Sequence, residues 1–275
     1  MPPAPVRRGA RRTSPRTNKA ESENPESLDV DTVEVKIEEL SRTNESVNWL
    51  WYGPSGVGKT TLVGGCPRAT FLSTERGTIA AKRTGSTAKL IKAYSWEACV
   101  AGKKLADEKL NPGEWLILDS ATKMQVLMIR WILRMQKQKK ASRDLDIPAI
   151  KDHQKWQNNF RRFIDDLIDA PYNTIFVCGD MRAEDEEMET VVLPAITGKG
   201  YEICDYVRAQ MDIVTYYGIT DKTPDGEPIR RALFQSVPPY IAPKDRYSVF
   251  GKYQDVADNE FTAMAEFVQM LEEAA

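Results

Sequence analysis

A run of eight residues near position 55 has the pattern of a phosphate-binding loop. Residues 53–60 read Gly-Pro-Ser-Gly-Val-Gly-Lys-Thr, which fits G-x-x-x-x-G-K-[ST]. The glycines permit backbone angles that larger residues resist, so successive N–H groups can point at one anion. Lys59 would then reach the β- and γ-phosphates of a nucleotide, and the Thr60 hydroxyl would ligate Mg²⁺. The pattern predicts a nucleotide site formed by Gly53, Pro54, Ser55, Gly56, Val57, Gly58, Lys59, Thr60 and Thr61.

A magnesium ion at such a loop needs a second protein anchor, and Asp119 is the candidate. It ends the apolar run Trp-Leu-Ile-Leu at residues 115–118, which is the Walker B form. The alternative is an aspartate that only ends a strand and caps the following helix. Ser120 stands where many P-loop ATPases have a glutamate, so the group that orients the attacking water must lie elsewhere.

Glu75 is the candidate for orienting that water. It follows a short apolar run at residues 71–73. If this run is a strand beside the Walker B strand, Glu75 lies at the carboxyl edge of the sheet, where ligands bind in open α/β folds. The alternative is a surface ion pair between Glu75 and Arg76 or Lys82.

Three further polar residues could act on a nucleotide. Asp180 directly follows a strand predicted at 174–179, where it would sense the γ-phosphate or would simply begin a loop. Lys199 lies in a loop before a predicted helix, and Arg246 lies in a second loop. Each of these two cations could cap the phosphates of a neighbouring subunit, contact DNA phosphates, or remain a solvated side chain.

The elements that must position these groups alternate between short apolar runs and longer amphipathic runs. This alternation implies a parallel sheet covered on both faces. The turn signal Thr-Pro-Asp-Gly at 223–226 predicts an antiparallel hairpin appended to that sheet. We therefore expect an α/β fold with a mostly parallel sheet, helices on both faces and a C-terminal antiparallel hairpin. Strands are predicted at 47–52, 69–73, 115–119, 174–179 and 212–217, and helices at 59–64, 95–110, 122–138, 151–170, 200–210 and 259–273.

The composition excludes several classes of protein. The chain has 275 residues, of which 41% are apolar and 28% charged, so it can bury a core. No run of about 18 residues is free of charge, and the start lacks an apolar signal region, so we expect a cytoplasmic protein without a membrane span. The four cysteines lack metal-binding or redox spacing and are expected to be reduced core thiols. A single histidine leaves little material for a histidine-based metal site.

The first 40 residues have an uneven charge distribution. Residues 1–20 hold six Lys and Arg and no acid, whereas residues 21–40 hold eight Asp and Glu and one Lys. With almost no large apolar side chains, residues 1–30 are predicted to be a disordered arm, and residues 31–275 a single ATPase domain. The arm would touch nucleic-acid phosphates, or it would be a solvated tail that neutralises the acidic stretch.

In their order, the motifs resemble those of phage-encoded RecA-like P-loop ATPases with AAA-type nucleotide-binding domains. This group includes ATP-dependent single-strand annealing proteins of phage recombination modules. The resemblance covers roughly residues 45–250. It rests on 53–61, 71–77, 116–120, 165–170 with 173–177, 193–199, 212–214 and 244–246.

The resemblance implies a RecA-like P-loop NTPase fold that binds ATP, Mg²⁺ and single-stranded DNA and assists annealing or strand exchange. By it, Lys59 and Thr60 hold phosphate and Mg²⁺, Asp119 is the Walker B acid, and Glu75 matches the acidic residue after the second strand. Members of this group often have a histidine after the fourth strand, where this chain has Gly179-Asp180.

The sequence itself gives only weak support for DNA binding, because its isoelectric point is near 5.7. The helix predicted after the Walker B strand is followed by a loop with basic residues. In RecA-like folds, the loops that follow these strands line the DNA path. The aromatic stripe at 156–163 has the spacing of a buried helix face rather than of a base-stacking platform. The candidate DNA contacts are Lys139, Lys140 and Arg143.

These observations favour a Mg²⁺-dependent ATPase that acts on single-stranded DNA as a homo-oligomer, with a single-strand-binding protein as a possible partner. In this mechanism, Lys59, Glu75 and Asp119 carry the catalysis by positioning and charge stabilisation. Two alternatives remain. A P-loop kinase would need an Arg-rich lid over the phosphates; the cluster 130–143 could be mistaken for one, but it follows a long predicted helix and precedes another. A nucleotide-gated binding module would bind ATP without appreciable turnover.

Overall fold

The computed structural model describes residues 46–274, apart from residues 143, 199–201, 224, 227 and 257–259. The predicted arm at 1–30 and two of the candidate site residues, Arg143 and Lys199, therefore lie outside the described residues. In the part of the chain that is described, no helix combines the length and the apolar character needed to cross a membrane.

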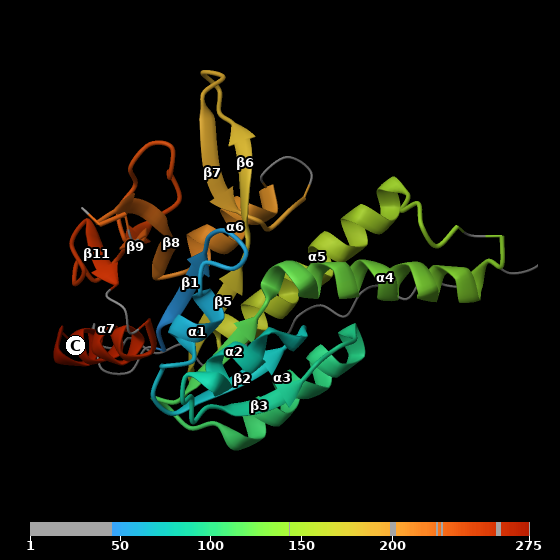
Figure 1. Cartoon of the computed structure of the whole chain (residues 1–275). Helices are drawn as coiled ribbons and strands as arrows, with labels where there is room; N and C mark the ends of the chain where they lie inside the picture. Colours follow the sequence, from blue (N-terminus) through green and yellow to red (C-terminus); the bar gives the residue numbers. More distant parts are fainter. Residues whose placement is uncertain are drawn as a thin grey trace, which may run out of the picture. The chain divides into compact units, whose positions relative to one another are not determined.

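The described residues are built on a nine-stranded sheet with the order β11-β9-β8-β1-β5-β4-β2-β3, and β10 pairs with β8 (Figure 1). The six strands from β8 to β3 are parallel to one another, and β9, β10 and β11 are added antiparallel. The strands are β1 (Asn48–Tyr52), β2 (Ala69–Ser73), β3 (Lys89–Lys92), β4 (Trp115–Asp119), β5 (Asn173–Cys178), β8 (Ile213–Lys222), β9 (Pro228–Leu233), β10 (Lys244–Asp245) and β11 (Tyr253–Val256).

Helices cover both faces of the sheet because its central strands are buried on both sides. Along β1, Leu50 and Tyr52 face one core and Trp49 and Trp51 face the other, as the two-residue period of a strand requires. The first core is closed by α3 (Trp96–Lys109), α4 (Ala121–Lys139), α5 (Ile150–Ile168) and α6 (Glu202–Gln210). The second core is closed by α1 (Lys59–Val63), α2 (Ile79–Arg83) and α7 (Glu260–Ala274).

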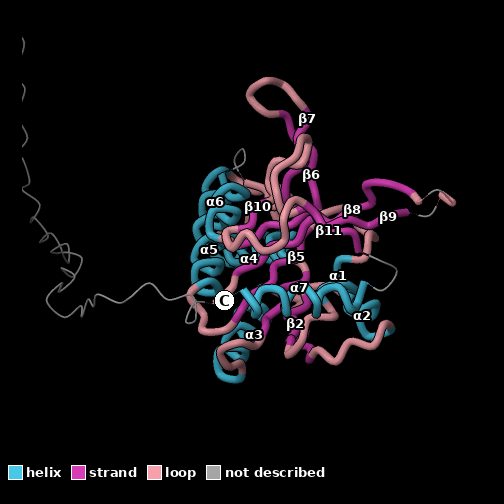
Figure 2. The backbone as a smooth tube through the Cα atoms, turned by 90° about the vertical axis from the view of Figure 1, so that its left-hand side faces the viewer, coloured by secondary structure: helices cyan, strands magenta, loops and turns pink. Residues whose placement is uncertain are grey.

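Two features extend beyond this layered arrangement. A separate two-stranded hairpin, β6 (Asp180–Glu184) with β7 (Thr190–Pro194), projects from the end of β5 (Figures 1 and 2). Helices α4 and α5 pack against each other and form a long two-helix arm (Figure 1). Within that arm the aromatic stripe of α5 is buried, as its spacing predicts, because Trp156, Phe160 and Phe163 belong to the first core.

The predicted fold class is confirmed, and the five predicted strands and six predicted helices are present within a few residues of the predicted bounds. The predicted turn at 223–226 joins β8 to β9, although both strands are longer or shifted relative to the prediction. Strands β3, β6, β10 and β11 were not predicted, since they are short or rich in polar residues. Strand β7 was also not predicted, although it reads Thr-Val-Val-Leu-Pro and is mostly buried. The four cysteines are free and buried, as expected.

Candidate nucleotide site

The loop between β1 and α1 has the conformation that its glycines were expected to allow. Gly58 is the N-cap of α1 in the left-handed region, with φ of 105°. Gly53 lies against β8 so closely that a Cβ at this position would be 2.0 Å from the carbonyl oxygen of Tyr217. No side chain caps the start of α1, and the first N–H groups of a helix lack partners within it, so this end of the helix favours an anion.

Lys59 lies folded across the same loop. Its Nζ donates hydrogen bonds to the carbonyl oxygens of Gly53 and Pro54, both at 2.7 Å. Burial lowers the pKa of its ammonium, and nearby carboxylates, among them Asp180 and Asp119, act in the opposite direction. The ammonium is thus held at the mouth of the loop, within the range of charges from two other strands.

Thr60 and Asp119 meet in the structure, although they are 59 positions apart in the sequence. The Thr60 hydroxyl donates a hydrogen bond of 2.9 Å to Asp119 Oδ2. Asp119 is 3% exposed, and its burial raises the pKa from 3.8 to about 6, against the lowering effect of the Thr60 hydrogen bond. A buried carboxylate whose ionised form is this poorly stabilised is suited to a cation.

Glu75 also belongs to this site, because β2 lies directly beside β4. The register places Ser73 opposite Asp119, so the chain that leaves β2 passes the end of the Walker B strand. Ser120 Oγ donates a hydrogen bond of 2.7 Å to Glu75 Oε1. The condition stated for Glu75, that its strand lies beside the Walker B strand, is met.

Ser120 and Thr74 fasten these two strand ends to each other. Thr74 Oγ1 accepts a hydrogen bond from the Ser120 N–H at 2.8 Å and donates one to the Ser120 carbonyl at 3.0 Å. Ser120 Oγ also accepts a hydrogen bond from Lys123 N–H and is the N-cap of α4. Ser120 therefore performs the capping that was the alternative role for Asp119, and Asp119 is left to face Thr60.

The site has the ligands that Mg²⁺ usually takes from a P-loop protein. Mg²⁺ keeps several waters and binds through one or two protein oxygens together with substrate phosphates. The Thr60 hydroxyl and the Asp119 carboxylate supply those oxygens. Across the described ranges, no three His, Cys, Asp or Glu side chains gather into a separate metal cluster. The geometry fits Mg²⁺ bound together with a nucleotide.

Of the three further residues predicted to act on a nucleotide, Asp180 is near Lys59, Arg246 is bound elsewhere in the chain, and Lys199 is not described. Asp180, at the start of β6, is close enough for its charge to act on the pKa of Lys59. Arg246 donates hydrogen bonds to Asp212 Oδ1 at 3.0 Å and to the Ala209 carbonyl at 2.6 Å, which ties β10 to the turn between α6 and β8. Arg246 therefore has partners within its own chain, while Lys199 lies outside the described residues.

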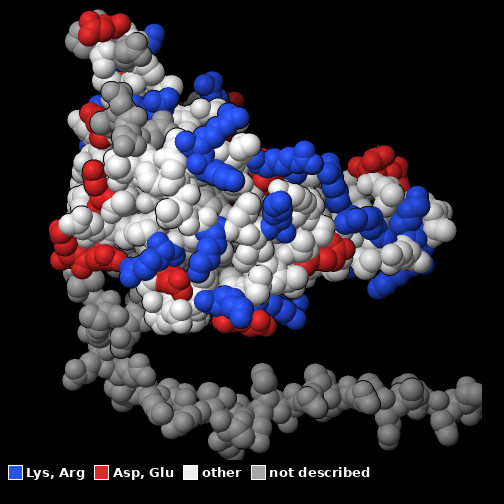
Figure 3. Space-filling model, turned by 60° about the horizontal axis from the view of Figure 1, so that its bottom comes forward, with Lys and Arg blue, Asp and Glu red and all other residues white. Residues whose placement is uncertain are grey.

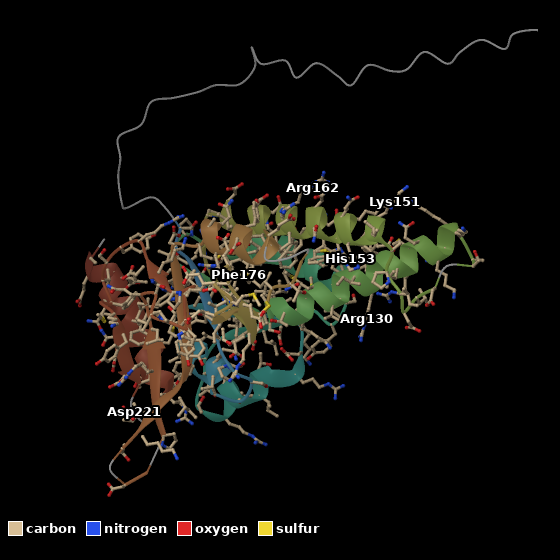
Figure 4. The ribbon with its side chains drawn as sticks, turned by 90° about the horizontal axis from the view of Figure 1, so that it is seen from above. Arg130, Lys151, His153, Arg162, Phe176 and Asp221 are labelled. Carbon is tan, nitrogen blue, oxygen red and sulfur yellow. The ribbon has the colours of Figure 1, made fainter. Side chains whose placement is uncertain are left out.

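Two of the three predicted DNA contacts, Lys139 and Lys140, lie on the two-helix arm, and Arg143 lies outside the described residues. Lys139 and Lys140 are exposed at the end of α4, and a helix of 19 residues spans about 28 Å. Figure 4 shows Arg130 on α4 and Lys151 on α5, with their side chains directed away from the interior, where Phe176 lies. The arm thus presents cations at a distance from the nucleotide site.

Several residues of the site were not found from the sequence. The Thr74 hydroxyl and the Arg230 guanidinium, whose Nε donates to the Val57 carbonyl at 3.2 Å, contribute through long-range pairing. Thr122 accepts a hydrogen bond from the Gly179 N–H and donates one to the Ala195 carbonyl, which anchors the β6–β7 hairpin to the start of α4. Thr74 could have been found, because it is a hydroxyl residue directly after a predicted strand. No local feature of the sequence indicates a role for Arg230.

Comparison with known proteins adds to this geometry. A family model described as an AAA domain matches residues 45–247. Among solved structures, a KaiC-like protein from the hyperthermophilic archaeon Pyrococcus horikoshii is similar to this chain. The two share 12% sequence identity, the match covers 73% of this chain and 84% of that one, and the TM-score is 0.42. A search of curated proteins found no match.

Proposed function

We propose that this chain, which belongs to the AAA domain family by the model that matches residues 45–247, is a Mg²⁺-dependent ATPase that acts on single-stranded DNA. The observation that carries the nucleotide part is the 2.9 Å hydrogen bond between Thr60 Oγ1 and Asp119 Oδ2. It brings the P-loop hydroxyl and the Walker B acid together at the carboxyl edge of the sheet, beside Glu75.

In the proposed reaction, the amides of the P-loop and the start of α1 bind the phosphates of ATP. Lys59 exchanges its two carbonyl partners for the β- and γ-phosphates. Thr60 and Asp119 would hold Mg²⁺, which would neutralise charge on the phosphates. Glu75 orients a water for in-line attack on the γ-phosphorus and takes up its proton. The bond from that phosphorus to the bridging oxygen breaks, and ADP leaves with this oxygen.

The link between Glu75 and Ser120 gives the proposed catalysis a structural basis. A hydrogen bond from a hydroxyl holds the carboxylate in one orientation, as a general base requires. Because Ser120 also caps α4, the position of Glu75 is tied to the helix that leads into the two-helix arm. Ser120 therefore contacts the proposed catalytic base and also begins α4, the first helix of the two-helix arm.

The DNA part of the proposal rests on surface charge and on the resemblance of the motifs. Cations are widespread along the exposed sides of α4 and α5, although the protein as a whole is slightly acidic. Such a stripe is the electrostatic footprint expected for contacts with phosphates. We further propose a homo-oligomer, recruitment by a single-strand-binding protein, and a role in phage recombination or replication.

One assay tests this proposal against its two alternatives. ATP hydrolysis by the full chain is measured with and without single-stranded DNA, and with a panel of small phosphate acceptors. Turnover that DNA stimulates supports the proposal. Turnover that requires a small acceptor would show a kinase, and tight ATP binding without turnover would show a nucleotide-gated binding module.

A further inference from the structure

A groove between α2 and β3 lies outside the nucleotide site and next to Glu75. It encloses about 530 Å³ between Ile79 and Lys82 of α2 and Leu90 and Lys92 of β3, and we call it the α2–β3 groove. β3 is the last strand of the sheet in the described residues, and α2 is only five residues long. The short helix covers β2 but leaves the outer strand uncovered on that face.

The floor of the α2–β3 groove is apolar. Phe71 on β2 is paired in register with Leu90 on β3, so the two side chains lie on the same face of the sheet. Phe71 is 3% exposed, whereas Leu90 is 46% exposed. Tyr94, just beyond β3, is 47% exposed and lines the same groove. An apolar floor with an accessible aromatic ring is suited to a flat, stacked ligand.

The rim of the groove is positively charged. Arg76, Lys82, Lys89 and Lys92 line it, and no Asp or Glu is among its lining residues. None of these four cations forms an ion pair with another residue that the structure describes. Figure 3, in which the bottom of the view in Figure 1 comes forward, shows many Lys and Arg on that surface, with Asp and Glu among them. Cations gathered along one rim with no acidic side chain lining it favour a ligand with several negative charges.

We propose that the α2–β3 groove binds single-stranded nucleic acid, with bases stacked on Tyr94 and Leu90 and phosphates held by Arg76, Lys82 and Lys92. Single strands are recognised by this combination of a positive groove and an aromatic platform, whereas the bases of a duplex cannot reach such a platform. An acidic peptide would satisfy the cations but would make no use of the exposed ring. The choice of ligand rests on the proposed function, which supplies single-stranded DNA as the partner.

The α2–β3 groove lies close to the nucleotide site. Arg76 follows Glu75 directly, and the 3-10 turn Arg76–Thr78 leads into α2. Gly77 of that turn lies beside the P-loop, since a Cβ on it would be 3.9 Å from Thr60 Oγ1. A single-stranded nucleic acid bound to Arg76 and Lys82 would therefore contact the segment directly after Glu75, the proposed catalytic carboxylate. By contrast, Lys139 lies at the far end of α4.

The test measures binding of a fluorescein-labelled oligo(dT) to the full chain by anisotropy, in the absence of nucleotide. Tyr94→Ala is expected to raise the Kd about fivefold or more, because the stacking platform is lost, whereas Tyr94→Phe keeps the Kd within about twofold of wild type. The double variant Lys82→Ala/Lys92→Ala is expected to reduce the slope of log K against log salt by about 1.4. Lys104→Ala/Lys109→Ala, which removes two exposed lysines from α3, is the matched control and is expected to bind as wild type.

Three outcomes would overturn the proposal. In the first, the groove variants bind the oligonucleotide as tightly as the control, whether or not Lys139→Ala/Lys140→Ala loses binding, which would show that the groove holds no part of it. In the second, poly-glutamate displaces the oligonucleotide with equal potency from wild type and from Tyr94→Ala, which would show a groove for acidic peptides. In the third, wild type binds no oligonucleotide. DNA-independent ATP hydrolysis of the same preparation is measured separately, so failure of the groove is distinguishable from failure of the ATPase assignment.

Discussion

Two neighbouring residues, Asp119 and Ser120, divide the work of the site between them. Asp119 accepts a hydrogen bond from the Thr60 hydroxyl. Ser120 donates a hydrogen bond to Glu75 and caps α4. Asp119 could be identified from the sequence because an apolar strand that ends in a carboxylate follows a P-loop. The role of Ser120 could not, since it depends on β2 lying beside β4, which the order of elements does not specify.

Glu75→Gln tests the proposed base. The amide can still accept a hydrogen bond from Ser120, but it cannot take a proton from water. We expect kcat for ATP hydrolysis to fall by about 10²–10⁴, with ATP affinity within about twofold of wild type. The measurement is steady-state hydrolysis together with equilibrium ATP binding.

Ser120→Ala is the companion variant, because it removes the hydroxyl that orients Glu75 and leaves the carboxylate in place. A smaller loss of kcat is expected, together with a loss of about 1 kcal/mol in stability from the missing helix cap. Undiminished turnover in Glu75→Gln would contradict the assignment.

The buried Asp119 carboxylate predicts a pH-dependent stability. Its folded pKa, about 6, lies above the ordinary 3.8, so the folded state binds this proton more tightly and stability decreases as pH rises through this window. Asp119→Asn is therefore expected to stabilise the metal-free protein at pH 8 by up to ~3 kcal/mol, and progressively less as pH falls toward 4. Urea unfolding in a chelator-containing buffer measures this difference.

Asp166→Asn is the control for this experiment, because it removes an exposed carboxylate from α5. It is expected to leave the stability nearly unchanged at each pH. The same gain in Asp166→Asn, or a gain in Asp119→Asn that is independent of pH, would show that burial of the Asp119 charge is not the cause.

At the scale of elements, the strands that carry the site were the ones with continuous apolar runs. β1, β4 and β5 are buried on both faces, and such strands leave a clear signal in the sequence. β3 reads Lys-Leu-Ile-Lys and β6 reads Asp-Met-Arg-Ala-Glu, because an edge strand and a projecting hairpin can expose polar side chains. β3 and β6 are stabilised by pairing with other strands, and their own residues do not show which strands these are.

The contact between the P-loop and β8 makes a prediction at this scale. Gly53→Ala places a Cβ 2.0 Å from the Tyr217 carbonyl oxygen, which is a backbone atom and cannot rotate away as a flexible side chain could. One of the two elements must move, so we expect a loss of more than about 3 kcal/mol in stability, or failure to fold. Thermal unfolding of purified protein checks this.

Gly56→Ala is the matched control in the same loop. Its Cβ would meet no atom within 4 Å, and the only strain comes from a φ of +82°. A loss of about 1 kcal/mol is expected. Equal stability losses in the two variants would show that packing against β8 is not what requires Gly53.

For the molecule as a whole, the alternation of strands and helices was sufficient to predict the parallel sheet and its two helical layers. It was not sufficient to predict which strands are neighbours, and the candidate site depends on that order. The contact of Arg230 with the P-loop and the α2–β3 groove both arise from pairings between distant segments. They became visible only with the topology.

The proposed oligomer is tested at the same scale. If ATP binding favours assembly, light scattering should give a mass that rises to a multiple of the 31.1 kDa chain when Mg²⁺ and ATP are added. Lys59→Ala, which lacks the phosphate-binding ammonium, should keep its nucleotide-free mass under both conditions. A wild-type mass that is unchanged by Mg²⁺ and ATP would argue against nucleotide-driven assembly.

The central claim is that the P-loop, with Thr60 and Asp119, holds a triphosphate together with Mg²⁺. Calorimetric titration of ATP into the full chain, with and without Mg²⁺, measures this directly. The account predicts tighter binding with Mg²⁺, loss of most of that gain in Thr60→Ala, and loss of binding in Lys59→Ala. Full ATP affinity in Lys59→Ala, or an equal Mg²⁺ effect in wild type and Thr60→Ala, would contradict it.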